Sequence, residues 1–328
     1  MQANNQKIVV LGTGGTIAGE SESADEGLSY KAAQRGIGEL LKSASSTHLA
    51  WPEVLAACQF EAEQVAQLDS RDMDFETWIR LAQRCDHWLA QDDVAALVVT
   101  HGTDTLEETA YFLSQVLNHS KSIVLTCAMR PANFKDADGP QNLRDALLVA
   151  ATTKGPGVWL VAAGEIHHSQ FVQKVHPTRL NAFDSGETGA AGRVQKDKVQ
   201  WFENFSKPLP NLRLHVSQLP LPTQWPWVEI VMNHVNASQK HVDALVNAGV
   251  QGLVIAGTGN GSVSSKVKES LVRAQVADVQ IRLSSRCNQG AVIPTSSHVF
   301  DAKGALSPAK TRVALLLDIM SERQSHCP

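Results

Sequence analysis

The segment that most limits how this chain can fold is KIVVLGTGGTIAG, residues 7–19, where a short apolar strand runs into a glycine-rich turn. Its consecutive apolar residues, IVVL, predict a strand buried on both faces, as in a parallel sheet. The glycines that follow, Gly12, Gly14 and Gly15, permit backbone dihedrals and close ligand approach that a β-carbon would prevent. The Thr16 hydroxyl is therefore presented at the carboxyl edge of a sheet, where it serves either as a nucleophile or as a cap for the turn.

A second segment, VVTHGTDTLEETAY at 98–111, repeats this arrangement of apolar strand, polar turn and helix. In an open parallel sheet, ligands bind outside the carboxyl ends of the strands. We therefore expect Thr16 to converge with Thr103 and Asp104 at one edge of the sheet.

Strand-like and helical segments alternate through the first two thirds of the chain, in the βαβ order of a parallel sheet. Apolar runs predict strands at 7–11, 94–100, 121–127 and 157–163. Helical periodicity predicts helices at 74–91, 105–118 and 140–153. The second of these helices has Thr105 and Glu108 at the spacing of a capping box.

Prolines accumulate between 201 and 226 without a sustained period, which predicts a connecting segment. We therefore predict an N-terminal α/β domain at 1–205 with a mainly parallel sheet flanked by helices, a linker at 206–226, and a smaller C-terminal α/β domain at 227–328. In the smaller domain, strands are expected near 227–232, 250–256 and 279–284, and helices near 239–248, 262–273 and 308–320.

The composition excludes several classes of partner. A net charge of −4 with no cluster of Lys and Arg argues against nucleic acid and for a small-molecule substrate. No stretch approaches the ~20 apolar residues that span a bilayer, and the opening MQANNQK lacks the apolar core of a signal peptide. The five cysteines contain no C-x-x-C pair, which favours reduced thiols and a cytoplasmic location.

A threonine hydroxyl becomes a useful nucleophile only beside a proton acceptor and near donors that stabilise an oxyanion. Asp104 follows Thr103 directly, and Lys174 lies in the apolar-flanked run FVQKV at 171–175. Partial burial could lower the pKa of Lys174 towards that of a base. The alternative is a surface lysine whose alkyl stem lies along an apolar surface.

Together, GTGGTIAG and THGTDTLEETA resemble the two signature motifs of the bacterial-type L-asparaginase (asparaginase/glutaminase) family. The resemblance continues in register along nearly the whole chain. It runs through LDSRDM (68–73), CAMRPANFKDADGPQNL (127–143), the Lys174 region, GTGNG (257–261) and LSSRCNQG (283–290).

This resemblance implies an amidohydrolase that converts L-asparagine to L-aspartate and ammonia through an acyl-enzyme, without a metal or organic cofactor. The preference between asparagine and glutamine stays open. Thr16 is similar to the family's nucleophile and Tyr30 to its partner from a flexible loop. Thr103, Lys174 and Asp104 match the family's Thr-Lys-Asp arrangement.

The remaining site residues also follow from the resemblance. Ser70 and Asp104 match positions that hold the substrate's carboxylate and ammonium, and Ala128 lies near the expected oxyanion donors. Gly15 and Gly102 let the backbone approach the substrate. The family counterpart of Asn260 reaches the active site of a neighbouring subunit, which implies a homo-oligomer, a tetramer built as a dimer of dimers.

Two positions depart from the family pattern. Arg71 stands where periplasmic-type relatives often carry Gln or Glu, and a guanidinium cannot accept a hydrogen bond. It must turn onto a carboxylate such as Asp72 or contact the substrate carboxylate. Ser297 stands where several relatives have an intersubunit glutamate, with Asp301 as the nearest acid.

Arg130, Asp136 and Asp138 are expected to support the 103–104 loop structurally rather than to take part in the chemistry.

Two rival hypotheses remain. A nucleotide-binding doubly wound domain also carries glycine-rich turns, but G-x-G-x-x-G read from Gly12 or Gly257 fails at its last glycine, and no G-x-x-x-x-G-K-[ST] loop is present. A relative that kept the fold and lost activity is the second rival, since fold does not entail function.

Overall fold

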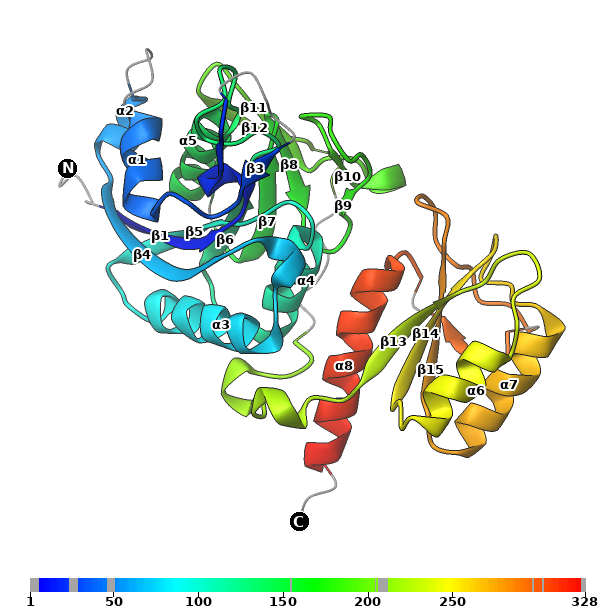
Figure 1. Ribbon diagram of the computed structural model, residues 1–328. Coiled ribbons are helices and arrows are strands. Elements are labelled where there is room, and N and C mark those ends of the chain that lie inside the picture. The colour runs from blue at the N-terminus through cyan, green and yellow to red at the C-terminus, as the bar shows by residue number, and fades with distance from the viewer. Residues whose placement is uncertain are drawn as a thin grey trace. The chain divides into compact units, whose positions relative to one another are not determined.

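The computed structural model describes residues 6–23, 29–45, 51–153, 155–203, 205, 212–296, 298–302 and 304–325. The chain divides into two compact units, Met1–Leu212 and Arg213–Pro328 (Figure 1). Each unit has its own sheet and helices, so the predicted α/β class with a smaller C-terminal α/β domain is confirmed.

An eight-stranded sheet forms the centre of the N-terminal unit, in the order β12, β11, β8, β7, β6, β5, β1, β4. Its strands are β1 (Lys7–Gly14), β4 (Gln59–Leu68), β5 (Val94–Thr100), β6 (Ser122–Thr126), β7 (Gly157–Ala162), β8 (Glu165–His168), β11 (Gly192–Gln195) and β12 (Lys198–Trp201). Strands β4, β1, β5, β6 and β7 pair in parallel, whereas β8, β11 and β12 add antiparallel pairs at one end. The sheet is therefore mainly parallel, as predicted.

Helices cover both faces of this sheet. They are α1 (Ile37–Ser45), α2 (Glu53–Ala56), α3 (Phe75–Leu89), α4 (Leu106–Val116) and α5 (Gly139–Thr152). Ile8 and Val10 of β1 belong to the core beneath α1 and α5. Because side chains alternate along a strand, Val9 and Leu11 point to the opposite face, where α3 and α4 lie. Burial on both faces explains the unbroken apolar run of β1.

The strands that the sequence did not predict lie at the margins of the fold. Strand β4 lies at the sheet's edge, and its segment QFEAEQVAQL is largely polar and partly exposed, so it lacks the apolar run of a central strand. Strands β8, β11 and β12 at the other end of the sheet were missed as well, as was the two-residue strand at 301–302 in the C-terminal unit. Two short antiparallel pairs were also missed. They are β2 (Glu20–Ser21) with β3 (Tyr30–Lys31), and β9 (Gln173–Lys174) with β10 (Phe183–Asp184).

The predicted capping box at the start of α4 is wrong. Thr105 is the N-cap residue, but its side chain makes no capping hydrogen bond. Its hydroxyl instead donates to the Ser70 carbonyl oxygen at 2.8 Å. This bond ties the start of α4 to the turn that follows β4.

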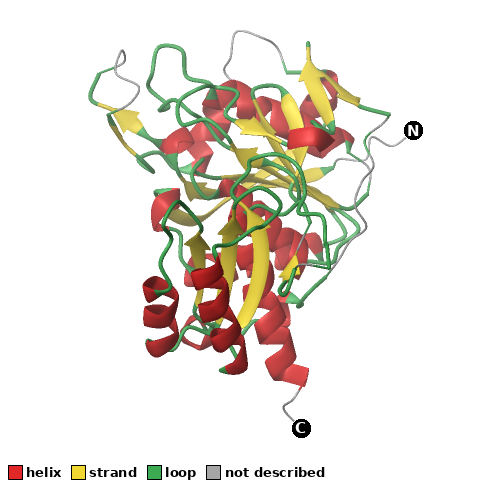
Figure 2. Cartoon of the chain, turned by 90° about the vertical axis from the view of Figure 1, so that its right-hand side faces the viewer, coloured by secondary structure: helices red, strands yellow, loops and turns green. Residues whose placement is uncertain are grey.

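The C-terminal unit contains a four-stranded parallel sheet with helices on both faces (Figure 2). Its strands are β13 (Val228–Met232), β14 (Gly252–Gly257), β15 (Gln280–Ser285) and β16 (Asp301–Ala302), and its helices are α6 (Lys240–Asn247), α7 (Ser265–Val276) and α8 (Pro308–Ser325). Leu253 and Ile255 pack in a core with Val242 of α6 and Leu271 of α7. Helix α8 covers the other face, against β13 and β14.

One buried acid in α5 should make folding stability depend on pH. Burial, with a smaller contribution from the nearby Asp197 carboxylate, raises the pKa of Asp145 to about 7. An unfolded aspartate loses its proton near pH 3.9, so between about pH 4 and pH 7 the folded chain binds more protons. Stability contributed by this group is therefore present at low pH and lost as pH rises through that window.

We expect Asp145→Asn to remove this dependence while still accepting the hydrogen bond from Gln141. Urea denaturation at pH 5 and pH 8 should show the variant gaining up to roughly 3 kcal/mol on the parent at the higher pH, at about 1.4 kcal/mol per pKa unit. Asp92→Asn, at an exposed turn, is the control and should keep the parental slope. Parallel slopes for parent and Asp145→Asn would contradict the assignment.

Candidate active site

The turns that follow β1 and β5 meet through two glycines. Gly15 has φ +80°, and a β-carbon on it would lie 2.3 Å from the Gly102 Cα. A β-carbon on Gly102 would lie 2.5 Å from the Ser70 Oγ. Backbone thus packs directly on backbone here, which brings the turns carrying Thr16 and Thr103 together as predicted.

Thr16 opens a short 3-10 helix, η1 (Thr16–Ala18), immediately after this contact. Its side chain is buried, and its Oγ1 lies 2.6 Å from the Tyr30 hydroxyl oxygen. Burial raises the pKa of the Tyr30 phenol above its usual value, although its bond to Thr16 opposes the shift. At neutral pH the phenol is protonated, so it is a hydrogen-bonding partner for Thr16 rather than an ionised base.

Thr103 and Asp104 share one lysine. Lys174, on β9, has its Nζ 2.8 Å from Thr103 Oγ1 and 2.6 Å from Asp104 Oδ1. The lysine side chain is 16% exposed, whereas that of Asp104 is 53% exposed. The structure therefore brings together all three members of the Thr-Lys-Asp arrangement, and the Asp104 carboxylate still faces solvent.

The turn that follows β4 packs beside the Thr-Lys-Asp arrangement. It is a 3-10 helix, η2 (Ser70–Asp72), and Ser70 is 2% exposed. The Asp104 backbone N–H donates to Ser70 Oγ at 3.2 Å. Ser70 therefore lies against both Gly102 and Asp104, within the group of residues predicted for the site.

Arg71 takes the first of its two predicted orientations. Its Nε lies 3.3 Å from Asp69 Oδ2 and 3.8 Å from Asp72 Oδ2. The side chain is 73% exposed. Asp69, which the sequence analysis did not single out, is the nearer acid because it also accepts the Arg71 backbone N–H.

Ala128 is fully buried in the turn that follows β6, next to the end of β5. The Asp138 carboxylate accepts the backbone N–H groups of Met129 and Arg130, each at 2.9 Å. Arg130 also donates to the Asp136 carbonyl oxygen. Among the described residues, the hydrogen bonds of Arg130, Asp136 and Asp138 thus hold the Ala128 turn rather than the 103–104 loop that we had expected them to support.

A buried hydrogen-bond chain beneath Thr103 was missed by the sequence analysis. The Trp78 indole N–H donates to Thr109 Oγ1 at 2.8 Å, and Thr109 lies 3.0 Å from His101 Nε2. Because a carbonyl oxygen only accepts, His101 Nδ1 carries the ring proton and donates to the Gly102 carbonyl, and Nε2 of the neutral ring accepts from the Thr109 hydroxyl. Burial lowers the pKa of His101 to about 4, so the ring is neutral at neutral pH. The sequence carries no signal for this hydrogen-bond chain, because Trp78 and Thr109 lie on different helices.

The predicted site residue Asn260 belongs to the C-terminal unit. Its carboxamide pairs with the Ile293 backbone, donating to the carbonyl at 2.9 Å and accepting the N–H at 2.7 Å. Asp301 lies 3.4 Å from Arg282. Ser297 lies outside the described residues. The predicted reach of Asn260 into a neighbouring subunit stays a prediction.

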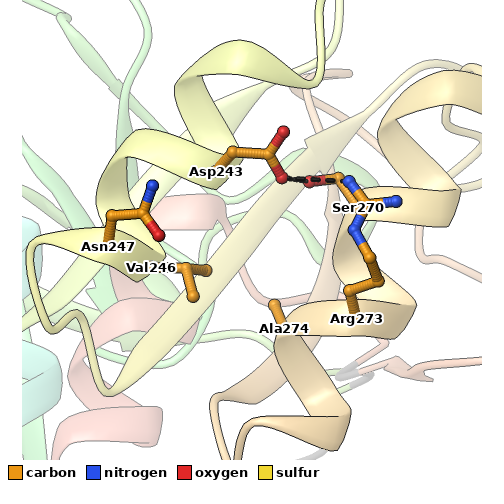
Figure 3. Close-up of a pocket in the computed structure, with 6 residues that line it drawn as sticks. All are labelled: Asp243, Val246, Asn247, Ser270, Arg273 and Ala274. Carbon is orange, nitrogen blue, oxygen red and sulfur yellow. Dashed lines mark hydrogen bonds and ion pairs between the residues drawn. The ribbon is translucent and has the colours of Figure 1, made fainter.

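A pocket of about 360 Å³ lies between α6 and α7, and none of the predicted site residues lines it (Figure 3). Its lining residues are Asp243, Val246, Asn247, Ser270, Arg273 and Ala274. Asp243 already accepts hydrogen bonds from Ser270 and Arg273. The Asp243 carboxylate and the Arg273 guanidinium therefore neutralise each other's charge. Among the residues the structure describes, no group of three His, Cys, Asp or Glu side chains is arranged to bind a metal.

Comparison with known families gives a match to each unit. The model of the asparaginase N-terminal domain matches residues 7–207, and that of the glutaminase/asparaginase C-terminal domain matches residues 227–324. Neither match supports the rival hypothesis of a nucleotide-binding module. Within the described part of the chain, no helix has the length and apolar character needed to cross a bilayer.

Individual relatives are similar to this chain over nearly its whole length. A probable periplasmic L-asparaginase of Haemophilus influenzae is 37% identical over 323 residues, covering 96% of this chain and 89% of its own. A glutaminase-asparaginase of Pseudomonas fluorescens is 35% identical, covering 97% and 87%. The crystal structure of a probable cytoplasmic L-asparaginase from Campylobacter jejuni superposes with a TM-score of 0.86 at 33% identity, covering 98% and 97%.

The contact between the two glycines can be tested by adding one methyl group. Gly102→Ala places a β-carbon 2.5 Å from Ser70 Oγ and 2.7 Å from Ser70 Cβ, so the turn must shift. We expect a loss of about 1–3 kcal/mol in the free energy of unfolding, as for an overpacked core. Urea denaturation measures it.

Gly38→Ala in α1 is the matched control, because its β-carbon would meet nothing within 4 Å. It should leave stability unchanged or raise it by up to about 1 kcal/mol, the helix preference of alanine. Equal stability of the two variants would show that the glycine contact is looser than described.

Proposed function

The chain belongs to the asparaginase/glutaminase family of amidohydrolases, and we propose that it hydrolyses L-asparagine to L-aspartate and ammonia with Thr16 as the nucleophile. One observation carries the proposal. Two hydroxyls with different partners, Thr16 beside a phenol and Thr103 beside an amine, lie on turns that touch through Gly15 and Gly102. Amide hydrolysis needs a nucleophile and a separate proton carrier, and this arrangement supplies both.

In the first step, Thr16 Oγ1 attacks the carbonyl carbon of the side-chain amide. The C–N bond then breaks and the nitrogen leaves as ammonia after gaining a proton, which leaves an ester on Thr16. The neutral Tyr30 phenol orients the Thr16 hydroxyl through its 2.6 Å hydrogen bond. Backbone N–H groups of the glycine-rich turns and of the Ala128 turn are the proposed oxyanion donors.

In the second step, water attacks the ester and the proton returns to Thr16, so one water is consumed for each ammonia released. The Thr103 hydroxyl moves protons between the reacting atoms and Lys174 Nζ, which lies 2.8 Å away. Asp104 holds Lys174 through Oδ1, and its exposed carboxylate is the proposed partner of the substrate ammonium. Ser70 is the proposed partner of the substrate carboxylate.

Glutamine is a second substrate to test, because a relative named glutaminase-asparaginase is 35% identical to this chain. We further propose a homotetramer built as a dimer of dimers, in which Asn260 completes the site of a neighbouring subunit. The proposed cytoplasmic location rests on the cysteines, since Cys58, Cys85, Cys127 and Cys287 are free thiols.

The test of the proposed function is ammonia release from asparagine and from glutamine. Thr16→Ala and Thr103→Ala should each lower kcat at least ~10³-fold, because groups that act as one catalytic unit are each indispensable. Thr16→Ser should retain measurable activity because it keeps a hydroxyl.

Thr13→Val is the matched control, since it removes a buried hydroxyl that lies near the end of β1, three residues before Thr16, and donates to the Thr100 carbonyl. It should cost far less than Thr16→Ala. Full activity in Thr16→Ala would refute the nucleophile assignment. A parent that hydrolyses neither amide would favour the inactive-relative hypothesis.

Arg71 should affect substrate binding more than turnover. Its guanidinium pairs with the neighbouring acids Asp69 and Asp72, and we propose that its positive charge disfavours the substrate ammonium. We expect Arg71→Gln to lower the KM for asparagine roughly two- to fivefold, the size of an exposed charge interaction, with a smaller change in kcat.

Steady-state kinetics at low ionic strength measure the effect of this substitution. Arg80→Gln, an exposed arginine of α3, removes the same net charge elsewhere and should leave KM unchanged. Identical kinetics for Arg71→Gln and the parent would place Arg71 outside the binding pocket.

A further inference from the structure

The outer edge of β2 is paired by an asparagine side chain. Asn133 Oδ1 accepts the Ser21 backbone N–H at 2.9 Å, and Asn133 Nδ2 donates to the Ser21 carbonyl oxygen at 2.7 Å. The Ser21 hydroxyl also lies 3.1 Å from Asn133 Oδ1. A single carboxamide therefore satisfies both main-chain groups of Ser21, as the backbone of an adjoining strand would.

The alternation of an antiparallel ladder explains why these groups are available. Ser21 stands opposite Tyr30, and Glu20 stands opposite Lys31. Successive residues of a strand direct their N–H and C=O groups to opposite edges, and those of Ser21 point away from β3. Gly19 faces the same outer edge, because its carbonyl accepts the Ala132 N–H at 2.8 Å. Residues 132–133 thus act as a third strand beside β2.

Tyr30 depends on the position of β2. It sits directly across the ladder from Ser21, and a β-carbon on Gly19 would lie 2.9 Å from Tyr30 Cδ2. The main chain at Gly19 is thus packed against the ring of Tyr30. A displacement of β2 would move the phenol oxygen from its place 2.6 Å from Thr16 Oγ1.

Asn133 itself is held by a well-bonded loop. The Phe134 N–H donates to the Pro131 carbonyl oxygen at 3.0 Å, and the Arg130 guanidinium lies over the Phe134 ring at 5.1 Å. Asp138 fixes the start of the loop through the N–H groups of Met129 and Arg130. The anchor therefore connects β2 to the same loop that holds the Ala128 turn.

We propose that Asn133 is a positioning residue, which holds β2 through the Ser21 main chain and thereby sets the Tyr30 hydroxyl on Thr16. The inference rests on the proposed function for its kinetic consequence, because it assumes that Thr16 reacts. It assigns no chemistry to Asn133, which contacts neither Thr16 nor Tyr30 through any described hydrogen bond. Its effect on the reaction passes through Tyr30 alone.

The kinetic experiment compares three variants with the parent. Asn133→Ala removes both bonds, and Asn133→Asp keeps the shape but sets an oxygen against the Ser21 carbonyl oxygen. Both should lower kcat roughly 10-fold to 100-fold, as a misplaced catalytic group does. Ser21→Ala is the matched control: it removes the hydroxyl and leaves the main-chain pairing, so kcat should stay within about twofold of the parent.

A double-mutant cycle separates positioning from general destabilisation. Tyr30→Phe removes the hydroxyl that Asn133 is proposed to place, so adding Asn133→Ala to Tyr30→Phe should lower kcat no further. A full additional loss would show that Asn133 acts by another route and would overturn the proposal.

A second readout is independent of catalysis. The chain has two tyrosines, Tyr30 and Tyr111, so 3-fluorotyrosine labelling gives two ¹⁹F signals, which Tyr30→Phe assigns. Asn133→Ala should shift or broaden the Tyr30 signal and leave that of Tyr111, buried in α4, unchanged. Ser21→Ala should move neither signal.

An unchanged Tyr30 signal in both Asn133 variants would overturn the proposal even if their activity fell. A shifted signal supports the anchoring step whatever the substrate. A parent without amidase activity would refute the proposed function, while the ¹⁹F result would still decide whether Asn133 places Tyr30.

Discussion

The close approach of the Gly15 and Gly102 backbones is the constraint on which the site depends. Parallel pairing of β1 with β5 brings the ends of both strands to one edge of the sheet, but side chains between the two turns would keep them apart. With no β-carbon on either residue, the turns touch, and the threonine that follows each glycine is carried into the same region. Sheet order and residue size together create the site.

The two hydroxyls then differ in their partners. Thr16 is paired with a phenol that burial keeps protonated, and Thr103 is paired with an amine that also touches a carboxylate. We propose that this difference in partners gives the two hydroxyls separate tasks, Thr16 as the nucleophile and Thr103 as the proton carrier.

The sequence predicted the central features of the fold because they have strong local causes. Strands β1, β5, β6 and β7 are buried on both faces and so appear as apolar runs, and the glycine-rich turns follow from backbone geometry. Edge strand β4 and the two-residue pairs β2/β3 and β9/β10 carry no such pattern, since tertiary contacts alone fix them.

The site residues likewise divide into those that the sequence identifies and those that only tertiary contacts define. Thr16, Thr103, Asp104 and Lys174 could be named from motifs and a family resemblance. The predicted capping box at Thr105 is absent, and the Thr105 hydroxyl instead donates to the Ser70 carbonyl, which lies far away in sequence. Asn133 and His101 were missed for a related reason, since each acts through a backbone group whose position only the folded chain defines.

The chain of bonds from Trp78 to the Gly102 carbonyl has a consequence for how the enzyme responds to acidity. Its direction is set by the Gly102 carbonyl, which only accepts, and its histidine would gain a proton only near pH 4. The hydrogen-bond chain beneath the Thr103 turn therefore keeps the same protonation state across the physiological pH range. A change of rate with pH near neutrality therefore does not originate in the protonation of this chain of hydrogen bonds.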